Sequence, residues 1–114
     1  MDSYTETASK LKVMGHPVRL QILGMLRHGE ICVCHIETAL GKRQAYISQH
    51  LMTLRDAGLV CARRDGLQVY YRLSDALAAD VLNLVYGTCE PPQAEALNGC
   101  SCPQCAAVSI NAIR

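Results

Sequence analysis

Between residues 30 and 73 the apolar residues are spaced first as in a short helix, then as in a longer helix, and then as in two strands. This order constrains the fold more than any other feature of the sequence. Residues 30–40 have the pattern of a short helix, and Gly41 suits the left-handed conformation that often ends a helix. Residues 42–57 repeat apolar side chains at helical spacing, and residues 60–73 alternate as two strands around a tight turn would. We therefore predict a short helix, a turn, a longer helix and a β-hairpin, in that order.

Further helices are predicted on both sides of this region. Residues 3–14 are weakly amphipathic, and Pro17 can begin a second helix that ends near Gly29, because the first helical turn needs no backbone N–H donor. Ser74 can cap a last helix whose apolar surface is wide enough to suggest a dimer seam. The apolar residues of this last helix are Leu77, Ala78, Val81, Leu82, Leu84 and Val85. The expected fold is mainly α with a small β-hairpin.

Length and composition bound the organisation of the chain. Its 114 residues fit one domain, which we place at residues 1–87. Residues 88–114 contain three of the four prolines and four of the seven cysteines, so we predict a Cys-rich tail there. No apolar run approaches the roughly 20 residues that span a bilayer, and the first residues lack a secretion signal. We expect a cytoplasmic protein without a membrane partner.

Positive charge is concentrated in the predicted longer helix and hairpin. Residues 41–72 contain six basic and two acidic residues, a net charge of +4, whereas the rest has five basic and eight acidic residues, or −3. A short helix, a glycine turn and a longer helix form the helix-turn-helix pattern, and an arginine-rich hairpin after it matches a wing. Double-stranded DNA is therefore the expected partner. The candidate DNA-binding residues are Lys42, Arg43, Gln44, Ala45, Tyr46, Ser48, Gln49, His50, Arg63 and Arg64.

The side-chain types suggest different roles at DNA. Lys42 and Arg43 can neutralise phosphates near the start of the longer helix, and the two wing arginines can hold the backbone or the minor groove. Gln49 has the donor and acceptor pair that suits adenine, and Ser48 can contact several bases or a phosphate. His50 lies close to the buried stripe, so a structural hydrogen bond stays open beside a DNA contact.

Three stretches of the chain, MGHPVRLQILGMLRHGEICVCHIETAL, ISQHLMTLRDAGLV and RRDGLQVYYRLSD, carry a family resemblance over roughly residues 8–87. They resemble the ArsR/SmtB family of metal-responsive winged-helix repressors. The resemblance implies a homodimer joined through the first and last helices, recognition of operator DNA by residues 42–57, and loss of operator affinity when inducer binds. No catalytic triad, phosphate-binding loop or pair of buried carboxylates is recognisable in the sequence. We expect no enzyme, no small-molecule substrate and no organic cofactor.

Cys32, Val33 and Cys34 match the arsenic-sensing Cys-Val-Cys motif of the resembled family. The resemblance also implies a third thiolate, but this chain has Glu37 there, and a carboxylate is a poor ligand for a soft ion. Residues two apart on a regular α-helix point about 200° from each other. We therefore expect Cys32 and Cys34 to bind one ion only if the first helical turn unwinds, which would distort the helix-turn-helix and release DNA.

The tail offers a competing site for a soft ion. Cys100, Cys102 and Cys105 place three thiols within six residues, and Cys89 could assist either site. Three thiolates favour a trigonal soft centre such as trivalent arsenic or antimony. A site shared between the tail and the helix-turn-helix cysteines stays open as well. Cys61 alternates with its neighbours in a predicted strand and is interpreted as a small core residue.

Other inducers and chemistries stay open at this point. Arsenite or antimonite is the preferred inducer, Cd²⁺, Pb²⁺ or Hg²⁺ is an alternative, and a thiol redox or sulfur-species sensor would need no metal. A zinc site on the last helix, common in the resembled family, is disfavoured because residues 74–88 contain no histidine. Residues 102–105 have Cys-x-x-Cys spacing, but no predicted strand-helix-strand unit precedes them, which argues against an oxidoreductase.

Overall fold

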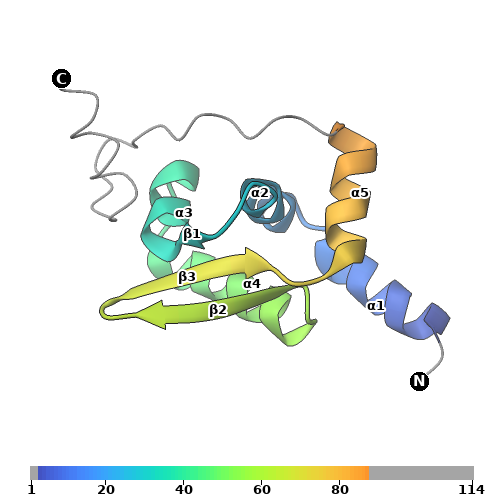
Figure 1. The fold of residues 1–114 in the computed structure, drawn as a ribbon, viewed down its shortest axis with the longest axis horizontal. Coiled ribbons are helices and arrows are strands. Elements are labelled where there is room, and N and C mark those ends of the chain that lie inside the picture. Colours follow the sequence, from blue (N-terminus) through green and yellow to red (C-terminus); the bar gives the residue numbers. More distant parts are fainter. Residues whose placement is uncertain (1–2, 88–114) are drawn as a thin grey trace.

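Five helices and a small antiparallel sheet form residues 3–87, which the computed structural model of this protein describes (Figure 1). In chain order the elements are α1 (Ser3–Met14), α2 (Pro17–Leu26), β1 (Ile31–Cys32), α3 (Val33–Leu40), α4 (Gln44–Asp56), β2 (Val60–Asp65), β3 (Gln68–Leu73) and α5 (Ala76–Tyr86). The predicted winged helix-turn-helix is confirmed, with α3 and α4 as its helices and β2 and β3 as its wing. Within residues 3–87, no helix has the length and apolarity needed to cross a membrane.

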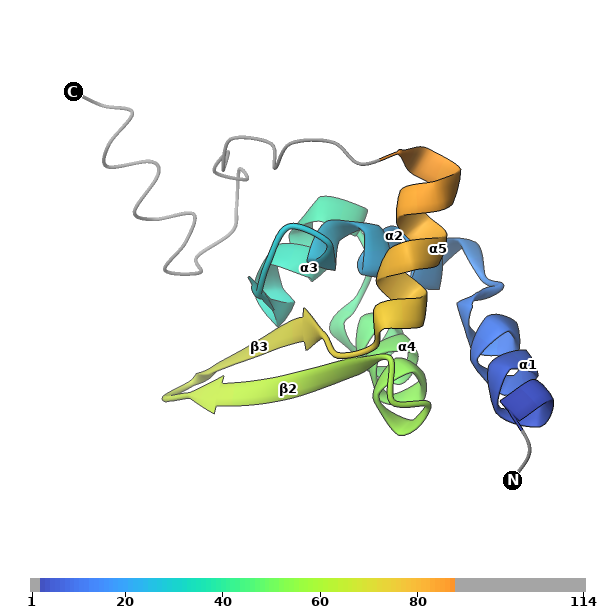
Figure 2. The same ribbon diagram turned by 45° about the vertical axis from the view of Figure 1, so that its right-hand side comes forward.

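The sheet contains one strand that the sequence analysis missed. Its order is β1-β3-β2, and the short strand β1 pairs with β3, with Cys32 opposite Tyr70. The segment 30–32 was predicted to be helical, but its pairing with β3 keeps the chain extended, so α3 begins only at Val33. Figure 2 shows the wing projecting away from the helices, and Figure 1 shows β1 beside β3.

Two glycines end their elements in the way that the sequence predicts. Gly41 adopts a left-handed conformation with φ of 63°, and its N–H donates to the carbonyl of Glu37 as the C-cap of α3. Gly66 has φ of 61° in the turn of the wing, a conformation that suits glycine because it has no Cβ atom. The turn therefore brings Asp65 of β2 opposite Gln68 of β3.

The core lies where α2, α3, α4, α5 and the base of the wing meet. Its fully buried side chains include Ile22, Leu23, Ile36, Ile47, Leu51, Leu54, Leu59 and Leu82. Leu67 is 99% exposed because it lies in the turn of the wing, beyond the core. Tyr70 is 8% exposed and lies opposite Cys32 of the unpredicted strand β1.

The start of α5 is fixed to α1 by Asp75. Asp75, and not the predicted Ser74, is the N-cap of α5, and its carboxylate accepts a hydrogen bond from the Leu77 N–H at 2.8 Å. The same carboxylate lies 2.6 Å from the Lys10 ammonium of α1. The hydrogen bond from Lys10 is the main reason that the pKa of Asp75 is lowered. Ser74 instead donates to the Gly58 carbonyl. Asp75 thus links α1 and α5.

The double role of Asp75 can be separated by substitution. Asp75→Ala removes both the cap and the ion pair, whereas Asp75→Asn keeps a capping oxygen and removes the charge. We expect Asp75→Ala to lower the free energy of unfolding by about 1 kcal/mol more than Asp75→Asn does, which is the usual contribution of an N-cap. Urea unfolding followed by circular dichroism measures both variants, and equal stabilities would show that the cap contributes nothing.

Candidate DNA-binding surface and dithiol site

The start of α4 presents most of the predicted DNA-binding residues on one exposed surface. Arg43 is the N-cap of α4 with extended backbone, and Tyr46 is 40% exposed. The Lys42 ammonium lies 5.9 Å from the centre of the Tyr46 ring. The exposed residues here are Lys42, Arg43, Gln44, Ala45, Tyr46 and Gln49, and Ser48 is half-buried beside them. The surface joins cationic, amide and aromatic groups next to the open end of a helix.

His50 faces the interior, unlike the other predicted DNA-binding residues of α4. Its exposed fraction is 9%, and its Nδ1 accepts a hydrogen bond from Arg19 Nε of α2 at 3.1 Å. The ring centres of His16 and Tyr46 lie 4.5 Å and 4.7 Å from that of His50. Burial lowers the pKa of His50, and the charges of His16 and Arg19 lower it further. His50 therefore holds α4 against α2.

The two wing arginines have different surroundings. The Arg63 guanidinium makes a double hydrogen bond with the Glu30 carboxylate, at 2.6 Å and 3.1 Å, and lies 4.8 Å from the centre of the Tyr70 ring. Arg64 is exposed on β2, and within residues 3–87 it forms no ion pair. Arg64 can thus reach a phosphate without breaking an internal contact, whereas Arg63 is already bound to Glu30.

Cys32 and Cys34 lie side by side at the start of α3. Their sulfur atoms are 2.7 Å apart, Cys32 is fully buried, and Cys34 is half-buried. The expectation that α3 must unwind to bring them together was wrong. Cys32 is the N-cap, with φ of −69° and ψ of 143°, so the angle between residues of a regular helix does not apply. The extended N-cap lets both sulfurs face the same side.

The amide oxygen of Gln68 completes the surroundings of this pair. It accepts hydrogen bonds from the Cys32 thiol at 3.0 Å and from the Cys34 thiol at 3.7 Å. In the described part of the chain no cluster of three or more histidine, cysteine or carboxylate side chains could hold a metal ion, so neither His35 nor Glu37 joins the pair. The sequence analysis missed Gln68, since only the pairing of β1 with β3 brings it near.

Among the described residues Cys61 is the one other cysteine, and it does not join the pair. Cys61 is half-buried on β2, where it pairs with Arg72 of β3. Cys89, Cys100, Cys102 and Cys105 lie outside the described residues, as does the predicted tail from residue 88 to 114. The dithiol of Cys32 and Cys34 is the site that the described residues offer to a soft ion.

Comparison with known proteins gives consistent relatives. Residues 16–61 match the family described as "Bacterial regulatory protein, arsR family". A biofilm growth-associated repressor of Xylella fastidiosa (strain Temecula1) is 42% identical over 81 residues, which are 71% of each chain. An arsenical resistance operon repressor of Escherichia coli (strain K12) is 39% identical over 90 residues, 75% of this chain and 76% of that one.

A solved structure extends these similarities to the fold. The homodimeric winged helix-turn-helix DNA-binding domain from Mycobacterium bovis superimposes with a TM-score of 0.67 at 37% sequence identity. The match covers 73% of this chain and 77% of that domain. The arrangement described above for α3, α4 and the wing is thus one that a DNA-binding domain uses.

The burial of His50 makes stability depend on pH. Because its pKa is lower in the folded protein than the usual 6.5, the unfolded chain takes up the proton first, and stability falls as the pH drops below about 6.5. We expect His50→Gln to lower stability at pH 8 and to weaken this acid dependence. Part of it should remain, because burial also lowers the pKa of His35. Urea unfolding at pH values about one unit apart, from about pH 5 to about pH 8, measures how the free energy of unfolding depends on pH.

A matched control uses the exposed His28 that follows α2. His28→Gln makes the same replacement away from the core and should keep the wild-type pH curve. An unchanged curve for His50→Gln as well would contradict the structural role of His50.

Proposed function

Because the chain belongs to the arsR family of bacterial regulatory proteins, and is thus a transcriptional repressor and not an enzyme, we propose that a soft ion controls it. The protein binds operator DNA as a homodimer and releases it when trivalent arsenic or antimony binds Cys32 and Cys34. The adjacency of the two sulfurs, 2.7 Å apart within the helix-turn-helix, is the observation that carries the proposal.

Operator recognition uses the exposed start of α4 and the wing. Lys42 and Arg43 neutralise phosphates, and the open N–H groups at the start of α4 favour an anion there as well. Gln49 is exposed one turn further along α4, where a glutamine can pair with adenine in the major groove. Arg64 holds the backbone from the wing. We omit His50 from this surface because it is buried against α2.

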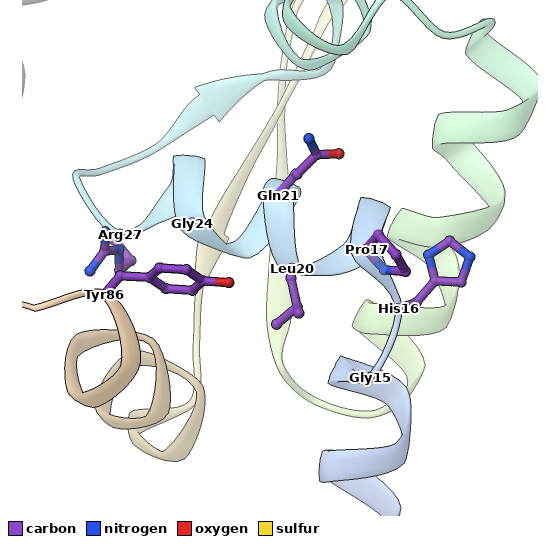
Figure 3. A pocket seen from close by; sticks show the side chains of 8 residues that line it. All are labelled: Gly15, His16, Pro17, Leu20, Gln21, Gly24, Arg27 and Tyr86. Carbon is purple, nitrogen blue, oxygen red and sulfur yellow. The ribbon is translucent and has the colours of Figure 1, made fainter.

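Dimerisation uses the exposed apolar surface of α1 and α5. Leu84, Val85 and Tyr86 of α5 are 86%, 64% and 60% exposed, and Tyr4 and Leu11 of α1 are exposed as well. Figure 3 shows the Tyr86 side chain reaching toward a hollow of about 680 Å³ that α2 and the turn before it line. A second copy would cover these side chains, and the homodimeric state of the M. bovis domain supports this arrangement.

Trivalent arsenic suits the dithiol because both are soft. When arsenite binds, each S–H bond is replaced by an S–As bond, and each hydroxide leaving arsenic takes the thiol proton and departs as water. Two thiolates leave one hydroxide on the trigonal arsenic, and a third thiol would displace it as water in the same way. We propose that a tail thiol does so, from Cys89, Cys100, Cys102 or Cys105, because the described residues supply no third soft ligand. The E. coli relative is named for arsenical resistance, which supports this inducer.

Two other inducers fit the same pair of sulfurs. Cd²⁺, Pb²⁺ or Hg²⁺ would bind the same thiolates. Alternatively, peroxide would oxidise two adjacent thiols to a disulfide while it is reduced to two water molecules, and the closeness of the sulfurs favours this second function. Mobility-shift titrations with arsenite, with Cd²⁺ and with peroxide distinguish the three inducers.

The cysteine pair gives the first functional prediction. Cys32→Ser and Cys34→Ser should bind the operator with wild-type affinity but lose release by arsenite, because a hydroxyl is a poor ligand for arsenic. Cys61→Ser, on β2, is the matched control and should respond as wild type does. Fluorescence anisotropy with a selected operator duplex measures each response. Continued full release from both variants of the pair would remove this dithiol from the mechanism.

The third ligand is tested in the same assay. A variant with serine at Cys100, Cys102 and Cys105 should need a higher arsenite concentration for release if the tail contributes a thiol. An unchanged arsenite requirement would leave Cys89 or no tail residue at all as the third ligand.

The DNA surface gives a further prediction. Arg64→Ala should weaken binding to all duplexes and reduce the salt dependence by about one unit of slope, as loss of one phosphate contact does. Gln49→Ala should instead relax the preference at one base pair by about 1–3 kcal/mol. Binding to the operator and to single-site mutants across salt concentrations measures both effects. Equal losses on every sequence for Gln49→Ala would contradict its role in base recognition.

A further inference from the structure

Gln68 joins the dithiol to the wing. It is the first residue of β3, directly after the turn, whereas the two cysteines belong to the segment where β1 passes into α3. Its amide oxygen accepts from both thiols, and the shorter hydrogen bond, 3.0 Å, comes from the buried Cys32. A single side chain of the wing is therefore held by the two sulfurs that the proposed inducer would occupy.

Backbone pairing and an ion pair add to this junction. Only two residue pairs connect β1 with β3, Ile31 with Tyr71 and Cys32 with Tyr70. The Glu30 carboxylate adds the ion pair to Arg63, which lies opposite Tyr70 across the wing. A change at the sulfurs therefore acts on the part of β3 that pairs with β1, next to the ion pair of Arg63.

An ion on the sulfurs is incompatible with the contact to Gln68. A thiol donates its proton to the amide oxygen, but a sulfur bonded to arsenic has no proton to donate. The amide oxygen would then face electron-rich sulfurs, and as a hard donor it is a poor ligand for a soft ion. Binding of the ion therefore removes the partner of Gln68 and leaves its oxygen against two acceptors.

We propose that Gln68 is a positioning residue that holds the wing in its DNA-binding orientation while the thiols are protonated, and frees the wing when an ion binds them. This inference rests on the proposed function of the dithiol. It assigns the release of DNA to a movement of the wing, with α3 remaining folded throughout.

The test uses the full chain, sodium arsenite as the probe, and two readouts. Absorbance from sulfur–arsenic bonds reports ion binding, and operator anisotropy gives the ratio of affinities without and with arsenite. Gln68→Met keeps the length of the side chain and removes the strong acceptor. We expect it to bind arsenite as wild type does, while its operator affinity without arsenite falls and the ratio approaches one.

The matched variant Gln68→Glu keeps an acceptor oxygen at the same reach. We expect it to retain the wild-type ratio or to exceed it, because a carboxylate accepts from thiols and is repelled by ion-bound sulfurs. The added charge changes the operator affinity both without and with arsenite, so its effect largely cancels in the ratio of the two affinities. Should Gln68→Met fail to fold by circular dichroism, Gln68→Asn, which withdraws the amide by one methylene, takes its place with the same expectation.

The outcomes separate the two proposals. If wild type and Gln68→Met bind arsenite and lose operator affinity by the same factor, Gln68 has no coupling role, and the proposed function stands. If wild-type protein develops no sulfur–arsenic absorbance, or develops it without losing operator affinity, control by arsenic fails and the role of Gln68 in it fails as well.

Discussion

The antiparallel pairing of Cys32 with Tyr70 is the contact on which the site depends. It holds Cys32 in an extended conformation, so α3 begins only at Val33 and both sulfurs face the same side. It also places the start of α3 beside the first residue of the wing, where Gln68 can reach both thiols. A helix continuing through Cys32 would turn the two sulfurs apart.

The two parts of the DNA-binding surface are attached to the core in different ways. α4 is fixed by Ile47, Leu51 and Leu54 in the core and by the hydrogen bond between His50 and Arg19. The wing is held along β3 by β1, next to its turn by Gln68, and on β2 by the ion pair of Arg63 with Glu30. The wing is the part on which a change at the dithiol acts directly, because Gln68 belongs to it and accepts from both thiols.

Local patterns in the sequence predicted most of the fold, and contacts between distant residues account for what they missed. The helices and the wing follow from apolar spacing, and Gly41 ends α3 as expected. β1 was missed because two residues have no periodicity and are extended only through a partner about forty residues away in sequence. The exposure of Leu67, the burial of Tyr70 and the contact of Gln68 with the thiols all follow from the turn position and this pairing.

Hydrogen–deuterium exchange with and without arsenite tests the central claim most directly, because backbone protection reports local opening. With the operator absent, the account predicts that arsenite speeds exchange in β1 and the wing, while the amides of α3 keep their protection. Loss of protection in the first turn of α3, with an unchanged wing, would contradict it. That result would mean that the ion acts by unwinding the helix and not through the junction of β1, Gln68 and the wing.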